Sequence, residues 1–128
     1  MNLFEYAVIR YVPRVEREEF LNVGVIVYCA SEKFLQVKFI IDKNRISALH
    51  PAFNMQELKE RLMAFCIICK GEATGGSIAR LPSASRFRWL TASRSTVVQT
   101  SPVHPGLCNS GEEVLEKLFN QLVCPEQL

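Results

Sequence analysis

Runs of apolar residues predict three strands in the first third of the chain. Residues Phe4–Val12 are rich in Tyr, Val, Ile and Phe, a composition typical of a strand. Val23–Cys29 is a continuous apolar run, as expected of a strand covered on both faces. In Phe34–Ile41 the apolar residues alternate with Gln36 and Lys38, which indicates a half-exposed strand. Because a short turn separates the last two runs, we expect them to form a hairpin.

Helical spacing of apolar residues predicts two main helices further along the chain. The first begins after Asn54, which can cap it, and ends at Gly71, which can adopt the left-handed conformation. Its buried stripe consists of Met55, Leu58, Leu62, Phe65, Cys66 and Cys69. The second runs from about Ser110 to Val123, and its apolar face consists of Leu115, Leu118, Phe119 and Leu122. A short helical segment after Asp42 is expected to end before Pro51, since a residue that precedes proline avoids helical geometry.

The remaining segments complete the predicted fold. Gly71–Ser85 contains two adjacent glycines and three serines and is predicted to be a flexible loop. Parts of Arg86–Thr91 and Ser95–Thr100 are predicted to be strands. Strands that are adjacent in sequence and joined by short turns favour antiparallel pairing. We therefore predict an α+β fold with an antiparallel sheet of about four to five strands and two main helices packed on one face. The length of 128 residues supports one domain over residues 1–128.

Composition and charge narrow the class of protein. With 48% apolar and 22% charged residues, the chain is an ordinary globular protein, and its net charge of +2 is too small to argue for nucleic-acid binding. The longest apolar runs fall well short of the roughly 20 residues that span a bilayer. Glu5 stands where a signal peptide carries basic residues. The five cysteines, an odd number, fit reduced thiols better than a disulfide framework. We therefore expect a cytoplasmic protein with no membrane partner.

The segment Arg86–Leu107 has the most unusual composition in the chain. It combines arginines with Ser and Thr hydroxyls, and no Asp or Glu occurs from Ala73 through Gly111. Guanidinium and hydroxyl groups bind phosphate or carboxylate oxygens, and here no nearby carboxylate competes for them. The segment is therefore a candidate anion-binding surface, although a solvated basic face has the same composition. The candidate ligand-binding residues are Arg86, Arg88, Arg94, Ser95, Thr96 and His104.

His104 is also a candidate catalytic residue. It lies between Pro102 and Pro105, which stiffen the backbone around it, and Ser or Thr hydroxyls nearby can act as nucleophiles. A general base needs an orienting partner, but the segment contains no acid to supply one. The alternative is a histidine that hydrogen-bonds within its own turn, and the composition therefore favours binding over catalysis.

A metal site is a further alternative. Cys66 and Cys69 form a C-x-x-C motif, and His104 with Cys108 would complete a zinc set. However, Cys66 and Cys69 fall on the apolar stripe of the predicted helix, where cysteines are usually small buried hydrophobes. The pattern thus favours structural cysteines, and we expect no metal or other cofactor.

A set of polar residues near the N-terminus interrupts the predicted strands. It consists of Tyr6, Arg10, Glu19 and Asn22. If Arg10 points into the core it needs a carboxylate, and Glu19 is the candidate. We therefore expect a structural ion pair between these two residues.

Three motifs together resemble a known family. They are Y-x-x-x-R-Y-V-P from Tyr6, E-F-L-N-V-G-V-I-V-Y from Glu19, and R-F-R-W-L-T-A-S-R-S-T-V-V-Q-T-S-P-V-H from Arg86. The chain resembles domain of unknown function 3037, a family of small bacterial proteins, with Ser93 where a proline is expected. The matching positions are Tyr6, Arg10, Glu19, Asn22, Gly24, Arg86, Arg88, Trp89, Arg94, Ser95, Thr96, Gln99, Ser101 and His104. The resemblance implies a possible partner, a HipA-type kinase of the kind found in toxin–antitoxin modules, and it says nothing about catalysis.

Taken together, these features favour a cytosolic binding or regulatory protein that engages an anionic group on a ligand or partner. The first alternative is a small enzyme with His104 as base and an arginine that stabilises developing negative charge. The second is a nucleic-acid-binding protein, which needs one continuous basic face with exposed aromatic residues.

Overall fold

The first three strands form where the apolar runs predict them. The computed structural model describes residues 1–125, in which β1 spans Asn2–Tyr11, β2 spans Leu21–Cys29 and β3 spans Phe34–Phe39. Short 3-10 turns, η1 (Val15–Arg17) and η2 (Ala30–Glu32), connect them. All three strands pair antiparallel, and β2 with β3 is the predicted hairpin.

The helix signals in the middle of the chain are also confirmed. Helix α1 (Lys43–Leu49) begins at Asp42, whose carboxylate accepts hydrogen bonds from the backbone N–H groups of its first turn. Helix α2 (Met55–Lys70) begins at Asn54, whose side chain accepts a bond from the N–H of Glu57 at 3.0 Å. It ends at Gly71, which has a φ of 69°. The capping residues therefore act as their positions in the sequence indicate.

The segment after α2 differs from the prediction. Where a loop and a strand were expected, the chain forms η3 (Ala73–Gly75), α3 (Gly76–Ala79) and α4 (Ser83–Leu90). The strand prediction at residues 86–91 is wrong because Phe87 and Leu90, three apart, are the residues that α4 buries. Pro82, directly before α4, fits a helix start, since its fixed φ is compatible with the first turn.

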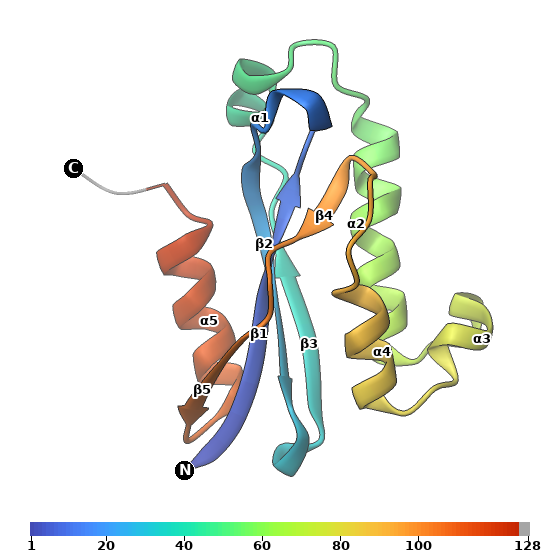
Figure 1. The fold of residues 1–128 in the computed structure, drawn as a ribbon, viewed down its shortest axis with the longest axis vertical. Coiled ribbons are helices and arrows are strands. Elements are labelled where there is room, and N and C mark those ends of the chain that lie inside the picture. The colour runs from blue at the N-terminus through green and yellow to red at the C-terminus, as the bar shows by residue number, and fades with distance from the viewer. Residues whose placement is uncertain (126–128) are drawn as a thin grey trace.

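Two short strands close the sheet on the free edge of β1. β4 (Val98–Thr100) covers only the end of the strand predicted within residues 95–100. β5 (His104–Cys108) was not predicted. Both pair with β1, so the strand order is β3-β2-β1-β4, with β5 beside β1 further along (Figure 1). β5 tolerates Pro105 because it is an edge strand that pairs on one side only.

A bulge near the start of β2 changes the face of the sheet to which the residues of β2 point. Ile9 pairs with Gly24 and Arg10 with Asn22, so Val23 is an extra residue opposite β1. As a result Val23 joins Ile26 in one buried cluster, although strict alternation would separate them. Gly24 is needed here because a Cβ would lie 2.8 Å from the carbonyl oxygen of Lys38.

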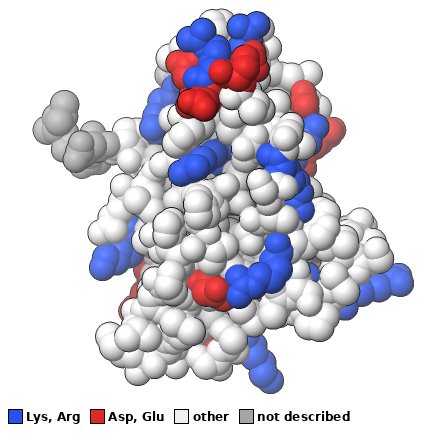
Figure 2. All heavy atoms as spheres, in the orientation of Figure 1, with Lys and Arg blue, Asp and Glu red and all other residues white. Residues whose placement is uncertain are grey.

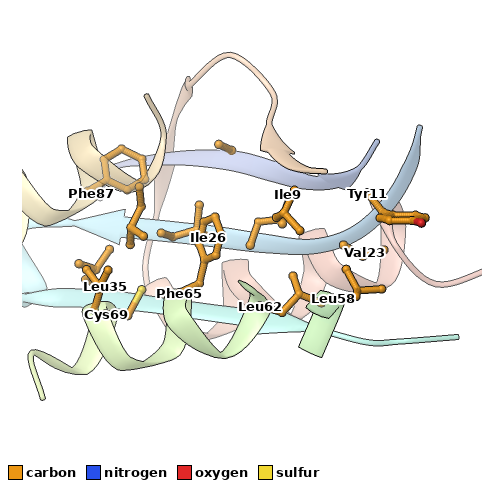
Figure 3. Close-up of a cluster of buried hydrophobic side chains, with 14 of the residues drawn as sticks. Ile9, Tyr11, Val23, Ile26, Leu35, Leu58, Leu62, Phe65, Cys69 and Phe87 are labelled. Atoms are coloured by element: carbon orange, nitrogen blue, oxygen red, sulfur yellow. The ribbon is translucent and has the colours of Figure 1, made fainter. Parts of the chain in front are cut away.

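The sheet separates two hydrophobic clusters, one on each face. The first lies under α2 and α4 and contains Ile9, Ile26, Leu58, Leu62 and Phe87 (Figure 3). The second lies under α5 (Gly111–Leu122) and contains Val25, Val27, Cys29, Leu115 and Phe119. The α+β class and the antiparallel sheet are confirmed. The expectation that both main helices pack on one face is wrong, because the apolar run of β2 requires cover on both faces, and α5 supplies the second (Figure 1).

No single helix in residues 1–125 is long and apolar enough to span a membrane. Among these described residues, α2 and Ala73–Ala79 pass the length and composition test as a pair, which is bent by 118°.

Candidate functional site

Arg86 is committed to holding two helices together. Its Nη1 donates to the carbonyl oxygens of Ile68 and Cys69, at 2.8 and 2.7 Å, in the last turn of α2. Its Nε donates to Leu81 O at 2.9 Å, and its Nη2 to Ser83 Oγ at 3.0 Å. These bonds occupy four of the five N–H donors of the guanidinium. The side chain therefore caps the C-terminus of α2, a position that favours a cation.

Arg88 forms an ion pair with an acidic residue outside its own segment. Its Nη2 donates to both carboxylate oxygens of Glu5 on β1, at 2.9 and 2.8 Å. Because α4 is a helix, residues two apart point in different directions, so Arg86 and Arg88 do not share a face as a strand would require. The acid that the segment itself lacks is thus supplied by Glu5, from a distant part of the chain.

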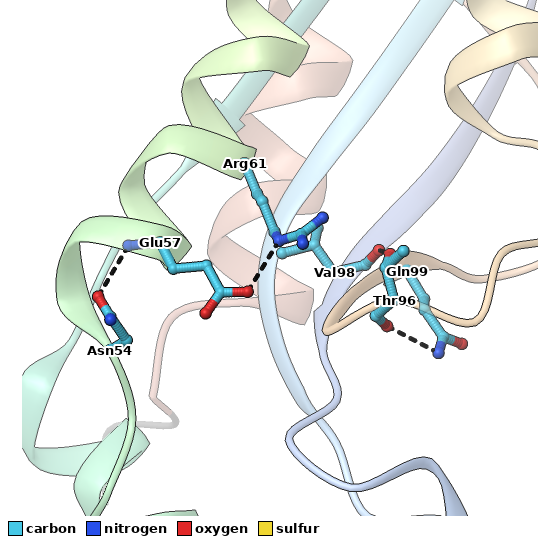
Figure 4. A network of polar contacts seen from close by, with 6 residues as sticks. All are labelled: Asn54, Glu57, Arg61, Thr96, Val98 and Gln99. Atoms are coloured by element: carbon cyan, nitrogen blue, oxygen red, sulfur yellow. Dashed lines mark hydrogen bonds and ion pairs between the residues drawn. The ribbon is translucent and has the colours of Figure 1, made fainter.

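Arg94 lines a groove between α2, α4 and β4. Its guanidinium carbon lies 4.2 Å from the centroid of the Trp89 ring, and it donates to the carbonyls of Trp89 and Leu90. The groove has a volume of about 190 Å³, and Thr96 and Arg61 also line it. Figure 4 shows Arg61 paired with Glu57 on α2, and Thr96, whose hydroxyl donates to Val98 O at 2.7 Å. Two of the six predicted ligand residues therefore meet here, beside an exposed Ser95.

His104 lies on the other face of the sheet. It is exposed on β5 opposite Tyr6, and the two rings are 5.3 Å apart between centroids. Among the residues the structure describes, none makes a hydrogen bond with the imidazole. The enzyme hypothesis therefore lacks an oriented base and a nucleophile in contact with it.

The N-terminal polar set is only partly as expected. The carboxylate of Glu19 pairs with Arg17, not with Arg10, so the predicted ion pair is wrong. The Arg17 guanidinium lowers the pKa of the Glu19 carboxyl, which is solvent-exposed. The reason is local: Arg17 and Glu19 are two residues apart in a turn, whereas Arg10 lies in the sheet.

Arg10 lies instead among uncharged neighbours. Asn22 on β2 and Gln99 on β4 are its cross-strand partners, one on each side. Its guanidinium carbon lies 4.2 Å from the centroid of the Phe20 ring. We call these four residues, Arg10, Phe20, Asn22 and Gln99, the Arg10 site.

Two buried polar atoms in the Arg10 site have no hydrogen-bond partner among the described residues. They are Nε of Arg10, a donor, and Oδ1 of Asn22, an acceptor. The amide of Asn22 is oriented by its Nδ2, which donates to Leu122 O at the end of α5, at 3.0 Å. Unpartnered buried polar groups are uncommon and destabilising. In this site Nε of Arg10 lacks an acceptor and Oδ1 of Asn22 lacks a donor.

The cysteines predicted as a possible metal set do not converge. Cys69 belongs to the cluster under α2, and Cys108 to the cluster under α5, so the sheet separates them. Burial raises the pKa of the Cys69 thiol to about 12, and burial also raises that of Cys66. Both are protonated structural residues at neutral pH.

Sequence reasoning missed two residues that the structure brings into these sites. Phe20 stands two positions before Asn22, and that spacing places the two side chains on one face of an extended segment. This spacing could have identified Phe20 from the sequence. Arg61 carried no such signal, since its place in the groove with Thr96 depends on how α2 packs against β4.

Charge on the surface is mixed rather than continuous. Figure 2 shows Lys and Arg interspersed with Asp and Glu at the end of the molecule near η1, and basic residues standing apart elsewhere on that face. The face drawn has no continuous basic surface of the kind that nucleic-acid binding requires.

Comparison with known proteins identifies the family. Neither the curated proteins nor the solved structures contain a match to this chain. The family described as protein of unknown function (DUF3037) matches residues 6–123, which include the whole Arg10 site and all five strands apart from the start of β1. The chain belongs to this family.

Proposed function

We propose that this protein is a cytosolic binding module that engages an anionic group of a partner through the Arg10 site. The observation that carries the proposal is the half-buried guanidinium of Arg10, which makes no ion pair or hydrogen bond among the described residues. Nε itself is buried, so a phosphate or carboxylate would bind at the accessible part of this side chain and supply the missing negative charge.

The other arginines of the chain support this choice by contrast. Ion pairs engage Arg14, Arg17, Arg61 and Arg88, and backbone carbonyls engage Arg45, Arg86 and Arg94. Arg80 is exposed on the surface. Within residues 1–125, Arg10 thus combines partial burial with the lack of a counter-ion. A guanidinium already held between strands and over Phe20 loses little entropy when it binds an anion.

Asn22 adds a requirement for the ligand. Its buried Oδ1 lacks a donor, and a ligand with an N–H or O–H group next to its anionic group would satisfy it once the Asn22 side chain moves outward. A phosphorylated or carboxylate-bearing segment of a protein satisfies both needs, since its backbone N–H groups lie beside the charge. Gln99, on the far side of Arg10, contributes a further amide to such a contact.

A titration with inorganic phosphate, followed by NMR, tests the site directly. We expect the Nε–H resonance of Arg10 to shift in a saturable way, and the shift to weaken as salt increases. Arg94→Ala should leave this response unchanged, whereas Arg10→Gln should remove it. If phosphate shifts the Trp89 and Arg94 signals and leaves Arg10 unaffected, the groove is the anion site and the proposal is wrong.

A co-purification experiment tests the partner. The partner implied by the family resemblance is a HipA-type kinase, and we expect wild type and Arg80→Ala to retain it while Arg10→Gln loses it. Thermal unfolding of each variant checks that the fold is intact. Recovery of the same proteins with wild type and Arg10→Gln would contradict a role of Arg10 in recognition.

A further inference from the structure

Three side chains able to bind a metal meet at the end of the sheet where α5 begins. They are Cys29 at the end of β2, Glu32 in η2 and Cys108 at the end of β5. Their ligand atoms all lie within 4.8 Å of one another. This cluster is separate from the Arg10 site and does not depend on the proposed function.

The cluster has a closed side and an open side. Cys29 is 0% exposed and Cys108 is 4% exposed, so the two thiols lie in the core under α5. Glu32 is exposed and faces them from the solvent side. One of its carboxylate oxygens, Oε1, accepts the backbone N–H of Gly111 at 2.6 Å, which orients the carboxylate. Such outer contacts are typical of ligands held ready for a metal.

A disulfide between the two cysteines does not fit the strand order. β1 lies between β2 and β5, so the two cysteine backbones are about two strand spacings apart, roughly 9–10 Å. Disulfides need Cα atoms closer than about 7 Å. A tetrahedral metal with metal–sulfur bonds of about 2.3 Å needs its sulfurs only about 3.8 Å apart, a separation these thiols can reach by small side-chain movements.

We propose that Cys29, Cys108 and Glu32 bind one zinc ion, with a water on the solvent side as the fourth ligand. Two thiolates and a carboxylate in a tetrahedral arrangement favour zinc over hard cations such as magnesium and calcium. Both thiols must lose their protons on binding. The ion would join β2 and η2 to β5 and the first turn of α5.

Metal binding to the reduced, chelator-treated protein tests the proposal. Equilibrium dialysis should find one zinc per chain, and zinc should raise the midpoint of thermal unfolding. Cobalt bound at the same site should show sulfur-to-metal charge-transfer absorption. Cys29→Ser and Cys108→Ser should abolish binding, and the matched control Cys66→Ser should retain it.

Glu32→Gln keeps the test decisive if the buried cysteine variants fail to fold. The glutamine can still accept the N–H of Gly111, so the fold is retained while a charged ligand is lost. We expect zinc affinity to fall by about tenfold or more. The proposal is wrong if the wild type binds no stoichiometric zinc, if its cobalt complex lacks the sulfur absorption, or if Glu32→Gln or a folded Cys108→Ser binds zinc as tightly as wild type.

Discussion

Ser101 and Val8 are joined by two hydrogen bonds, although 93 residues separate them in the sequence. The backbone N–H of Val8 donates to the hydroxyl of Ser101 at 2.8 Å, and the N–H of Ser101 donates to Val8 O at 2.8 Å. Ser101 is 3% exposed and lies between β4 and β5. Its side chain thus replaces a backbone acceptor and carries the pairing of β1 across the break.

Replacing this hydroxyl should destabilise the protein. Ser101→Ala leaves the buried N–H of Val8 without an acceptor, and we expect a loss of about 1–3 kcal/mol in the free energy of unfolding. Denaturant unfolding measures it. The control is Ser93→Ala at an exposed position, expected within about 0.5 kcal/mol of wild type. Equal stability of the two variants would show that water satisfies Val8 instead.

Arg86→Ala should destabilise α2 rather than weaken ligand binding. The substitution removes the donors to Ile68 O and Cys69 O, and the expected loss is about 1–3 kcal/mol. Arg80→Ala, an exposed arginine nearby, should stay within about 0.5 kcal/mol of wild type. An Arg86→Ala protein of normal stability with reduced phosphate binding would return Arg86 to the anion-binding surface.

Gly24→Ala should be destabilising for a steric reason. The added Cβ would lie 2.8 Å from Lys38 O and 2.9 Å from Phe39 Cβ, on the neighbouring strand β3. Neither atom can move without shifting the hairpin, so we expect a cost of about 1–3 kcal/mol in denaturant unfolding. A cost below about 0.5 kcal/mol would mean that the bulge opens easily.

Cys69 should make the stability decrease at alkaline pH. Burial raises its pKa from 9.0 to about 12 in the folded state, so the unfolded chain loses this proton first as the pH rises. The unfolded state then binds fewer protons, and the free energy of unfolding falls by up to about 1.4 kcal/mol per pH unit between these two pKa values. Unfolding at about pH 8 and about pH 10.5 should show a smaller decrease for Cys69→Ala than for wild type. Equal decreases would assign the effect to other groups.

The elements with purely local signals were predictable. Asp42, Asn54 and Gly71 determine helix ends through bonds to residues beside them, and the structure shows each one where expected. The α4 segment was not predictable in this way, because Arg86, Phe87 and Arg88 alternate like a strand while Phe87 and Leu90 repeat like a helix. The choice depends on burial of Phe87 under the sheet, which is a tertiary effect.

The candidate site was likewise predictable only where its features are local in the sequence. The sequence identified Arg10 and Asn22 as unusual polar residues in apolar strands, and the structure makes them cross-strand partners. Their lack of partners was not predictable, since Glu19 was available in the sequence and local geometry gave it to Arg17. Arg88 was misjudged for the converse reason, because its acid, Glu5, comes from the far end of the chain.

The position of β1 has a consequence for how the protein is made. β1 precedes β4 and β5 by most of the described chain, yet these two strands cover one of its edges. Until they emerge from the ribosome, β1 has an open, apolar edge that can pair with another chain. The sheet therefore cannot be completed before β4 and β5 are available, and we expect the nascent chain to need protection from aggregation until then.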